Sequence, residues 1–333
     1  MKFYTTPYHS NLINDNDRLS AFYEGIFEIF NEISSRSSNE ISSKRSNEIS
    51  NSGDFKPKIA LDIGSGSGVL SYFASICFDS VIAIEIDNKI IECAKKSFKE
   101  AEIDNVIFIN DDATSYKFIS EDVSSYKFIN DDVTSYKFDE EKFIDLIICE
   151  TLDTALIDEE ELIVLNNFRK YLKDNGKILP KGIINIAEPV FMEKDYIHYE
   201  DEEYHGKKPK YEILGDFVKF AEFDFCEYIS PEFKTIIDFN LNKYNLNDNF
   251  ENNNKIFGIK ITTFTKITDN IICGPTPMLN PPMFIPIDFN INNFNKNNQN
   301  LSNKNNNLNK NNISIKLEYI MGGGVETIKA NFI

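Results

Sequence analysis

Short apolar runs alternate with amphipathic stretches between residues 56 and 180. Four of these runs have the length and character of buried strands: residues 59–63, 80–85, 106–109 and 143–149. Residues 68–76 and 88–101, which separate the first three runs, have the spacing of helices. Strands and helices that alternate in this order are typical of a doubly wound, mostly parallel α/β sheet. We therefore predict an α/β domain over residues 55–182.

The pattern changes from about residue 183 onward, where aromatic residues and prolines are frequent and helix signals are few. Residues 283–287 and 313–320 are strand-like runs, and they flank a tract of Asn and Lys at about 290–312. A polar tract with few apolar residues cannot bury a core, so we expect a disordered insert there. We predict that residues 183–333 form a smaller antiparallel, β-barrel-like domain.

The N-terminal part contains an amphipathic stretch at residues 19–33, which a Ser-rich segment follows. The tetrapeptide Asn-Glu-Ile-Ser recurs here with a period of eight residues: 31–34, 39–42 and 47–50. That period moves an apolar position around an α-helix by about 80° per copy, so it builds no fixed apolar stripe. We expect residues 1–33 to form a helical segment and residues 34–54 to form a flexible linker or a frayed helical extension.

A ten-residue repeat follows the third predicted strand, with copies at residues 110–119, 120–129 and 130–139. An even period preserves the alternation of a strand, so the copies could form β-ribbons. Solenoid repeats are longer, about 20–50 residues, so a tandem duplication inside one loop explains the copies more simply. We expect an insertion at about 113–139 in the α/β domain.

The chain is strongly acidic, with 35 Lys and Arg against 53 Asp and Glu among 333 residues and a formal net charge of −18. Nucleic acid is bound through Lys and Arg that neutralise phosphates, so this balance disfavours RNA and suits a cationic substrate in an acid-lined cleft. The 5 cysteines form no C-x-x-C pair, which gives no sign of a disulfide framework or a metal site. The sequence shows no signal peptide and no apolar run of about 18 residues, so we expect a cytoplasmic protein without a membrane segment.

A glycine-rich turn joins the first predicted strand to the first predicted helix. It contains Asp62 and then the pattern G-x-G-x-G, formed by Gly64, Ser65, Gly66 and Gly68 with one further residue. Glycines allow the backbone to approach a ligand closely, and the following helix presents free N–H groups to it. Dinucleotide sites use G-x-G-x-x-G instead, and a tight turn without a ligand would also need glycines. The residues after the next two strands therefore bear on the choice between these readings.

Acidic residues follow the next two predicted strands. Glu85 ends the second strand, where a carboxylate can bond both ribose hydroxyls of a nucleoside. Asp112 and Ala113 follow the third strand, where they are placed to hydrogen-bond an adenine amino group. Asp122 and Asp132 offer the same chemistry in later copies of the repeat, and we favour Asp112 because its strand follows the preceding helix directly. With the glycine-rich turn, these residues resemble the cofactor site of Rossmann-like S-adenosylmethionine-dependent methyltransferases, which implies S-adenosylmethionine as the cofactor.

The N-terminal segment narrows the resemblance. The stretch from His9 to Arg18, HSNLINDNDR, resembles the H-x-x-M-L-x-D-x-x-R segment of protein arginine methyltransferases. In that family the helix that follows covers the cofactor, and its Arg pairs with the methionine carboxylate. The resemblance implies this role for Arg18 and places His9 in the cofactor site; an arginine in a surface charge pair is the simpler alternative. A guanidinium suits the task because it forks onto a carboxylate with two parallel hydrogen bonds.

The segment after the fourth predicted strand carries a second feature of the same family. Glu150 stands at the end of the strand, where an open α/β sheet places its reactive groups, and Glu159 follows nine positions later. Protein arginine methyltransferases carry two glutamates at this spacing. The resemblance implies that Glu150 and Glu159 are catalytic and hold a substrate guanidinium. The acids of residues 158–161 could instead form the solvated start of a helix.

The chain departs from the family at two loops and agrees with it at a third segment. The family's S-E-W-M-G-Y loop is here CETLDT, residues 149–154, without the aromatic residues and the glycine. The family's T-H-W loop is absent, and TPMLN, residues 276–280, occupies its neighbourhood. Residues 172–180 resemble the family's L-x-x-x-G-x-I-x-P passage into its β-barrel. The departures put the identity of the substrate in doubt, but not the use of the cofactor.

We predict an S-adenosylmethionine-dependent methyltransferase that acts on an arginine side chain of a protein substrate. An RNA methylase on the same fold is an alternative, because Asn280-Pro281-Pro282-Met283 resembles the N-P-P-[aromatic] motif of methylases that act on bases. Its place in the β-rich half, and Met283 instead of an aromatic residue, favour a turn at a sheet edge. A non-catalytic S-adenosylmethionine-binding scaffold protein is the third reading. A homodimer is compatible with each of them.

Overall fold

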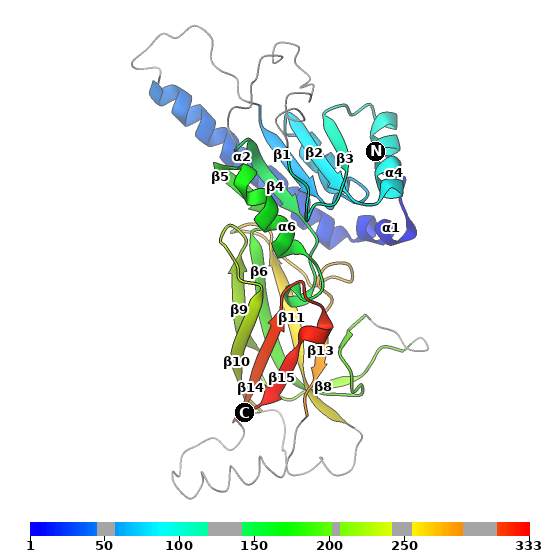
Figure 1. The fold of residues 1–333 in the computed structure, drawn as a ribbon, viewed down its shortest axis with the longest axis vertical. Coiled ribbons are helices and arrows are strands. Elements are labelled where there is room, and N and C mark those ends of the chain that lie inside the picture. Colours follow the sequence, from blue (N-terminus) through cyan, green and yellow to red (C-terminus); the bar gives the residue numbers. More distant parts are fainter. Residues whose placement is uncertain (45–56, 119–141, 202–206, 242–254, 289–311) are drawn as a thin grey trace, which may run out of the picture.

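The computed structural model describes residues 1–44, 57–118, 142–201, 207–241, 255–288 and 312–333. Residues 45–54 of the expected linker, the second and third copies of the ten-residue repeat and almost all of the expected Asn-rich insert lie outside the described residues. The described residues build an α/β domain and an antiparallel β domain, with a long N-terminal helix beside the α/β sheet (Figure 1).

A five-stranded parallel sheet forms the centre of the α/β domain. Its strand order is β3-β2-β1-β4-β5, and every pair of neighbours is parallel. The strands are β1 (Ile59–Ile63), β2 (Ser80–Glu85), β3 (Val106–Asn110), β4 (Ile144–Cys149) and β5 (Leu172–Leu179). All residues of β1, β2 and β4 are buried, as in parallel strands that are covered on both faces. The predicted α/β fold is therefore confirmed.

Helical segments connect these strands. They are α3 (Val69–Ser75), α4 (Asn88–Glu100), α6 (Glu161–Phe168) and the short 3₁₀ helices η2 (Thr154–Leu156) and η3 (Arg169–Tyr171). The strand order reverses at β1, with β2 and β3 on one side and β4 and β5 on the other. Ligands of such sheets bind outside the carboxyl ends of the strands at this point of reversal. The ends of β1 and β4 are therefore the expected place for a site.

Two helices precede the sheet, α1 (Pro7–Asn14) and α2 (Asn16–Lys44). Thr6 caps the start of α1, and its hydroxyl accepts a hydrogen bond from the backbone N–H of His9 (3.3 Å). α2 extends beyond the predicted stretch of 19–33, and residues 34–44 are helical, as in the second of the two expectations for residues 34–54.

The helix α2 packs on both domains. Its residues Phe22, Ile26 and Ile29 are at most 5% exposed and belong to a cluster with apolar side chains of β1, α3 and β4. The second domain contributes Ile267, Cys273 and Leu279 to the same cluster. One helix therefore joins the hydrophobic cores of the two domains.

Antiparallel strands form the second domain, in one sheet with the path β7-β13-β11-β6-β8 and another with the order β10-β14-β15. Two further strands pair off this path, β9 with β6 and β12 with β11. The elements are β6 (Gly182–Met192), β7 (His198–Tyr199), β8 (Tyr211–Ile213), β9 (Val218–Asp224), β10 (Glu232–Asn240), β11 (Ile256–Lys266), β12 (Ile272–Cys273), β13 (Met283–Pro286), β14 (Asn312–Ile320), η4 (Val325–Thr327) and β15 (Lys329–Phe332). Residues from both sheets share one hydrophobic cluster. The predicted antiparallel, barrel-like second domain is confirmed.

The tetrapeptide from Asn280 to Met283 is a turn that leads into β13. Asn280 is 1% exposed, and its Nδ2 donates a hydrogen bond to the hydroxyl of Thr265 (2.8 Å). β13 pairs with β11 on one side and with β7 on the other, so this turn enters a strand inside the sheet and not an edge strand as predicted. The buried amide of Asn280 is engaged in the fold of the second domain.

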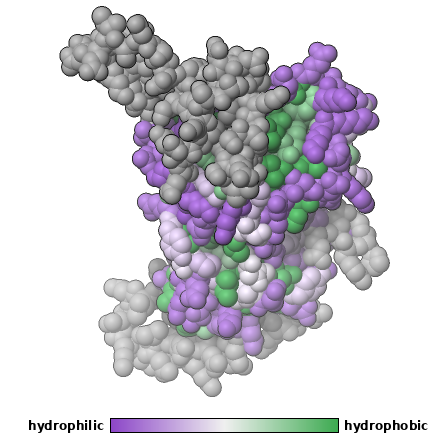
Figure 2. All heavy atoms as spheres, turned by 45° about the horizontal axis from the view of Figure 1, so that its top comes forward, coloured by the Kyte–Doolittle hydropathy of each residue, from purple (hydrophilic) through white to green (hydrophobic). Residues whose placement is uncertain are grey.

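Hydrophilic side chains cover much of the described surface in the view of Figure 2, with hydrophobic side chains in smaller areas among them. This surface agrees with the 26% of charged residues in the chain. Among the described helices, none is both long enough and apolar enough to cross a bilayer.

Candidate functional site

The glycine-rich turn after β1 allows other parts of the chain to approach it closely. Gly64, Gly66 and Gly68 have φ angles of +67°, +54° and +78°, a region that side chains rarely adopt. A Cβ at Gly66 would lie 2.9 Å from the ring of His9, and a Cβ at Gly64 would lie 2.8 Å from Cγ2 of Thr151. The turn therefore needs glycine both for its backbone conformation and for its contacts with α1 and with the segment after β4.

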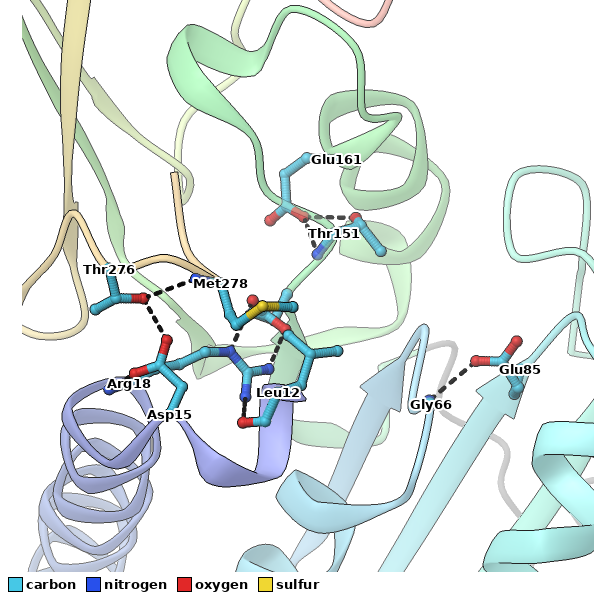
Figure 3. Close-up of polar contacts among 10 residues, drawn as sticks. Leu12, Asp15, Arg18, Gly66, Glu85, Thr151, Glu161, Thr276 and Met278 are labelled. Carbon is cyan, nitrogen blue, oxygen red and sulfur yellow. Dashed lines mark hydrogen bonds and ion pairs between the residues drawn. The ribbon is translucent and has the colours of Figure 1, made fainter. Parts of the chain in front are cut away.

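Glu85 connects this turn to the end of β2. Its Oε2 accepts a hydrogen bond from the Gly66 N–H (2.9 Å; Figure 3), and its Oε1 accepts one from the Asp87 N–H (2.9 Å). The side chain is 8% exposed. Each carboxylate oxygen can accept more than one hydrogen bond, so Glu85 keeps capacity for the hydroxyl groups of a ligand.

Asp62, in β1 just before the turn, and Ser65, in the turn itself, differ in their surroundings. Asp62 is 1% exposed and accepts a hydrogen bond from the hydroxyl of Ser71 in α3. Burial raises the pKa of Asp62 to about 7, and the bonds from Ser71 oppose this shift. Ser65 is 7% exposed, and its buried hydroxyl has no hydrogen-bond partner in the described part of the chain. Asp62 thus links β1 to α3 across the turn, and Ser65 offers a hydroxyl in the turn.

The helix α1 places His9 against the turn. The Nδ1 of His9 shares a hydrogen bond with Oγ1 of Thr6 (2.8 Å), and the other side of the ring lies at Gly66. Burial lowers the pKa of His9, whereas the charges of Glu85 and Asp87 act in the opposite direction. His9 is therefore a largely neutral imidazole at neutral pH, next to the turn and to Glu85.

Arg18 and Glu150 contact each other directly. The Nε of Arg18 donates to Oε1 of Glu150 (3.0 Å), and its Nη2 donates to Oε2, which makes the pair bidentate. The two side chains are 3% and 13% exposed. Burial lowers the pKa of Arg18, but Glu150 outweighs this effect and the net direction is upward, so the guanidinium stays charged. The sequence assigned Arg18 to the cofactor and Glu150 to the substrate, and the structure brings the two together.

A loop of the second domain reaches this ion pair through Asp15. Oδ1 of Asp15 accepts a hydrogen bond from the Arg18 N–H (3.1 Å), and its Oδ2 accepts one from the Thr276 hydroxyl. Oγ1 of Thr276 accepts in turn from the Met278 N–H (3.3 Å). Figure 3 shows the links from Met278 to Thr276 and from Thr276 to Asp15. Residues 276–280, which stand where the resemblance expects the T-H-W loop, therefore border the site.

Glu159 lies close enough to Glu150 for their charges to interact. Partial burial raises the pKa of Glu159, and the charges of Glu150, Asp158 and Glu160 raise it further. At the start of α1, burial raises the pKa of the Tyr8 hydroxyl, and the charges of Glu150 and Glu159 add to the shift. Two carboxylates that repel each other in this way attract a cation placed between them.

Asp112 and Ala113 follow β3, and both take part in local hydrogen bonds. Oδ1 of Asp112 accepts from the N–H (2.9 Å) and from the hydroxyl (2.7 Å) of Thr114, and these bonds lower the pKa of Asp112. The carbonyl of Ala113 accepts from the side-chain amide of Asn167 in α6 (2.9 Å). Asp112 also keeps lone pairs for a ligand. The alternatives in the later copies of the repeat lie outside the described residues.

Glu161 belongs to the site although the sequence did not single it out. It is 0% exposed, and its Oε2 accepts from the hydroxyl (2.8 Å) and the N–H (3.3 Å) of Thr151, as Figure 3 shows. Its Oε1 has no partner in the described part of the chain, and burial raises the pKa of Glu161 to about 8. The sequence grouped Glu161 with the solvated start of a helix, because an acidic run at a helix N-terminus does not show which member is buried.

Asp153 is a second residue that sequence reasoning missed. It is 8% exposed and accepts hydrogen bonds from backbone N–H groups of the loop that ends at Glu159. Its acidic character in a polar loop was the only signal in the sequence, and acidic residues are common throughout this chain.

The site therefore has two parts at the carboxyl ends of the strands. The first is the glycine-rich turn with Ser65, Glu85 and His9, which offers hydroxyl, carboxylate and imidazole groups to a polar ligand. The second is the pair Glu150 and Glu159, which suits a cation. Within the described ranges, no group of three or more His, Cys, Asp or Glu side chains could hold a metal ion.

Comparison with protein-family models finds no match. An uncharacterized protein of Methanothermobacter thermautotrophicus is 32% identical over 333 residues, which cover 100% of both chains. An uncharacterized protein of Methanocaldococcus jannaschii is 27% identical over 326 residues, or 97% of this chain and 96% of that protein. The histone-arginine methyltransferase CARMER of Aedes aegypti is 28% identical over 150 residues, which cover 43% of this chain and 22% of that protein.

Solved structures of arginine methyltransferases share the fold. The PRMT1 enzyme-prozyme heterotetrameric complex of Trypanosoma brucei, solved with AdoHcy, has a TM-score of 0.55 at 13% identity and matches 93% of this chain and 86% of that chain. PRMT6 with SAH has a TM-score of 0.57 at 11% identity and matches 98% of this chain and 99% of that chain. The likeness covers both domains, and at this identity it concerns the fold. The chain belongs to one family with the Methanothermobacter protein, and it has the two-domain fold of the protein arginine methyltransferases that its sequence resembles.

Proposed function

We propose that the chain is an S-adenosylmethionine-dependent methyltransferase that methylates an arginine side chain of a protein. The observation that carries this proposal is the bidentate contact of Glu150 with a guanidinium, here that of Arg18. Glu159 adds a second negative charge nearby, and we call Glu150 and Glu159 the glutamate clamp. The fold likeness to PRMT6 and the partial likeness to CARMER support the proposal.

The residues around the glycine-rich turn fit S-adenosylmethionine. Gly64 and Gly66 lack the Cβ atoms that would collide with their neighbours, and the Ser65 hydroxyl is buried without a partner in the described chain. Glu85 is the group for the ribose hydroxyls, and Asp112 is the group for the adenine amine. When bound, the cofactor supplies a methyl group on a positively charged sulfur.

Arg18 is the group for the methionine carboxylate of the cofactor. Its Nε and Nη2 now donate to Glu150, and a second carboxylate would need the same two donors. Cofactor binding therefore frees Glu150 for the guanidinium of a substrate. The glutamate clamp then holds this guanidinium by charge and hydrogen bonds and orients one of its nitrogens. Methylation of a guanidinium releases one proton, and the carboxylates of the clamp are the groups that accept it.

Incubation of the protein with a cell lysate and S-adenosylmethionine that carries tritium on its methyl group tests the proposal. We expect label in protein, recovered as methylated arginine after acid hydrolysis. Label in RNA or in small molecules but not in protein would contradict the arginine assignment. Calorimetry without saturable binding of S-adenosylmethionine or S-adenosylhomocysteine would contradict the cofactor assignment.

A non-catalytic S-adenosylmethionine-binding protein is a second candidate, and the contact between Arg18 and Glu150 favours it. This candidate holds if Arg18 keeps Glu150 when the cofactor is bound, because an occupied carboxylate is not available to a substrate. If the protein binds the cofactor but transfers label to no fraction of the lysate, this candidate replaces the enzyme. A homodimer stays a prediction, which analytical ultracentrifugation of the full chain checks.

A further inference from the structure

The loop that joins β4 to α6 carries the second glutamate of the clamp in an unusual backbone conformation. Two of its residues, Ala155 and Leu156, have φ angles of +59° and +60°. Residues other than glycine rarely adopt this left-handed conformation, and it persists where surrounding contacts hold it. The contacts of this loop therefore decide where Glu159 lies.

The second domain holds the loop from one side. Backbone groups of the loop pair with its residues: Ala155 N–H with Thr263 Oγ1 (2.9 Å), Leu156 O with Gly322 N–H (2.8 Å) and Ile157 O with Gly324 N–H (2.9 Å). The carboxylate of Asp158 accepts from the Tyr199 hydroxyl (2.5 Å) and from the Val325 N–H (3.1 Å). These contacts fix the loop as far as Asp158.

Asp153 holds the same loop from within. Its Oδ2 accepts hydrogen bonds from the N–H groups of Ile157 (3.0 Å) and Asp158 (2.9 Å), and its Oδ1 accepts one from the N–H of Glu159 (3.3 Å). Asp153 is 8% exposed, so water competes little for these bonds. Glu159 is the last of the three donors, and its backbone position therefore depends on the carboxylate of Asp153.

We propose that Asp153 is a positioning residue that fixes the backbone of Glu159 and thereby the second carboxylate of the glutamate clamp. The effect on catalysis rests on the proposed function, whereas the effect on the loop does not. Asp153 stands where the S-E-W-M-G-Y loop of the resembled family has glycine. The hydrogen bond from the Glu159 N–H to Asp153, which we call the anchor, is therefore a feature of this chain and not of that loop sequence.

The variant Asp153→Asn tests the anchor with little change in size. Asparagine has one acceptor oxygen, which can keep the two shorter bonds to Ile157 and Asp158. Its NH2 group then faces the N–H of Glu159 and accepts nothing from it. We expect hydrogen exchange at the Glu159 amide to become about tenfold faster, with an unchanged Kd for S-adenosylhomocysteine.

The matched control is Glu160→Gln, which removes one negative charge next to Glu159. The side chain of Glu160 makes no capping hydrogen bond at the start of α6. We expect this variant to leave the exchange rate of the Glu159 amide unchanged. An equal acceleration in both variants would attribute the effect to charge and would overturn the proposal.

Transfer assays test the consequence for the clamp. We expect Asp153→Asn to raise KM for an arginine peptide about tenfold and to have no further effect in a Glu159→Gln background, because Asp153 acts through Glu159. The proposal is overturned if the wild type transfers methyl groups while Asp153→Asn changes neither the exchange rate nor KM. A wild type that transfers nothing contradicts the proposed function, and the exchange rates still decide on the anchor.

NMR of the wild-type protein covers the case in which Asp153→Asn does not fold. The amide proton of Glu159 is expected to titrate together with the carboxyl carbon of Asp153, because the two groups are hydrogen-bonded. An amide proton that follows only the titration of the Glu159 side chain would overturn the proposal.

Discussion

Arg18 and Glu150 lie 132 positions apart in the sequence, and their side chains form a bidentate ion pair between α2 and the end of β4. Both are largely buried, with exposed fractions of 3% and 13%. A buried pair of this kind is costly to break unless another partner replaces the one that leaves. The proposed cofactor offers such a partner through its carboxylate, so the proposed function links cofactor binding and substrate binding through Arg18.

Cofactor and guanidinium should therefore bind with positive coupling. We expect methylguanidine or an arginine peptide to bind about tenfold more tightly in the presence of S-adenosylhomocysteine, which is within the usual range of such couplings. Calorimetric titrations with and without S-adenosylhomocysteine measure the effect. Adenosine, which lacks the amino-acid carboxylate, is the matched control and should give no coupling. Equal affinities in all three titrations would show that Arg18 does not exchange partners.

Glu150→Gln should separate binding from chemistry. We expect cofactor binding to persist and the transfer rate to fall by at least about 100-fold, since an amide offers the guanidinium no charge. The buried Arg18 also loses its anionic partner, so the free energy of unfolding should fall by about 3 kcal/mol. Urea unfolding and single-turnover transfer provide the two measurements. Glu160→Gln, which changes the charge of an exposed neighbour in the acidic run, should leave both nearly unchanged.

Gly66→Ala should weaken cofactor binding by at least about tenfold, because an alanine at φ +54° is strained and its Cβ would lie 2.9 Å from the ring of His9. The double variant Gly66→Ala with His9→Ala removes the collision but keeps the backbone strain. We expect it to recover part of the affinity relative to Gly66→Ala. Calorimetry with S-adenosylhomocysteine on the wild type and the two variants makes the comparison. No loss of affinity in Gly66→Ala would argue against a ligand at this turn.

Glu161→Gln should stabilise the protein at alkaline pH. The folded state raises the pKa of Glu161 from 4.5 to about 8, so the folded protein resists ionisation of this carboxyl. The stabilising contribution of the protonated form is complete below pH 4.5 and is lost as the pH rises through about 8. We expect the variant to exceed the wild type by about 2–4 kcal/mol in the free energy of unfolding at pH 8, and to match it at pH 4.5. Urea unfolding at the two pH values checks this, and a constant difference would contradict it.

The sequence was sufficient to predict the strands and the site residues whose surroundings follow from a local pattern of residues. Apolar runs predicted β1, β2 and β4, because strands that are buried on both faces contain few polar positions. The glycine-rich turn and Glu85 could also be identified from the sequence, since only one helix and one strand separate the two residues in contact.

Contacts between distant segments could not be predicted from the sequence. The partner of Arg18 depends on the docking of α2 against the end of β4, which no spacing of residues encodes. The burial of Glu161 depends on the rotation of α6, and the bonds of Asp153 depend on left-handed backbone at Ala155 and Leu156. Neither of those two residues is a glycine, so nothing in the sequence marked the turn.

The loop that carries Glu159 belongs by sequence to the α/β domain, but the second domain holds it at Ala155, Leu156 and Ile157. A fragment cut after residue 182 would keep all five parallel strands and the glycine-rich turn, yet it would lose every one of these supports. Such a fragment would keep the contact of Glu85 with the Gly66 N–H, but it would also lose the Thr276 hydroxyl at Asp15. A change in the loops of the β domain is therefore expected to move Glu159 without altering any residue at the carboxyl ends of the parallel strands.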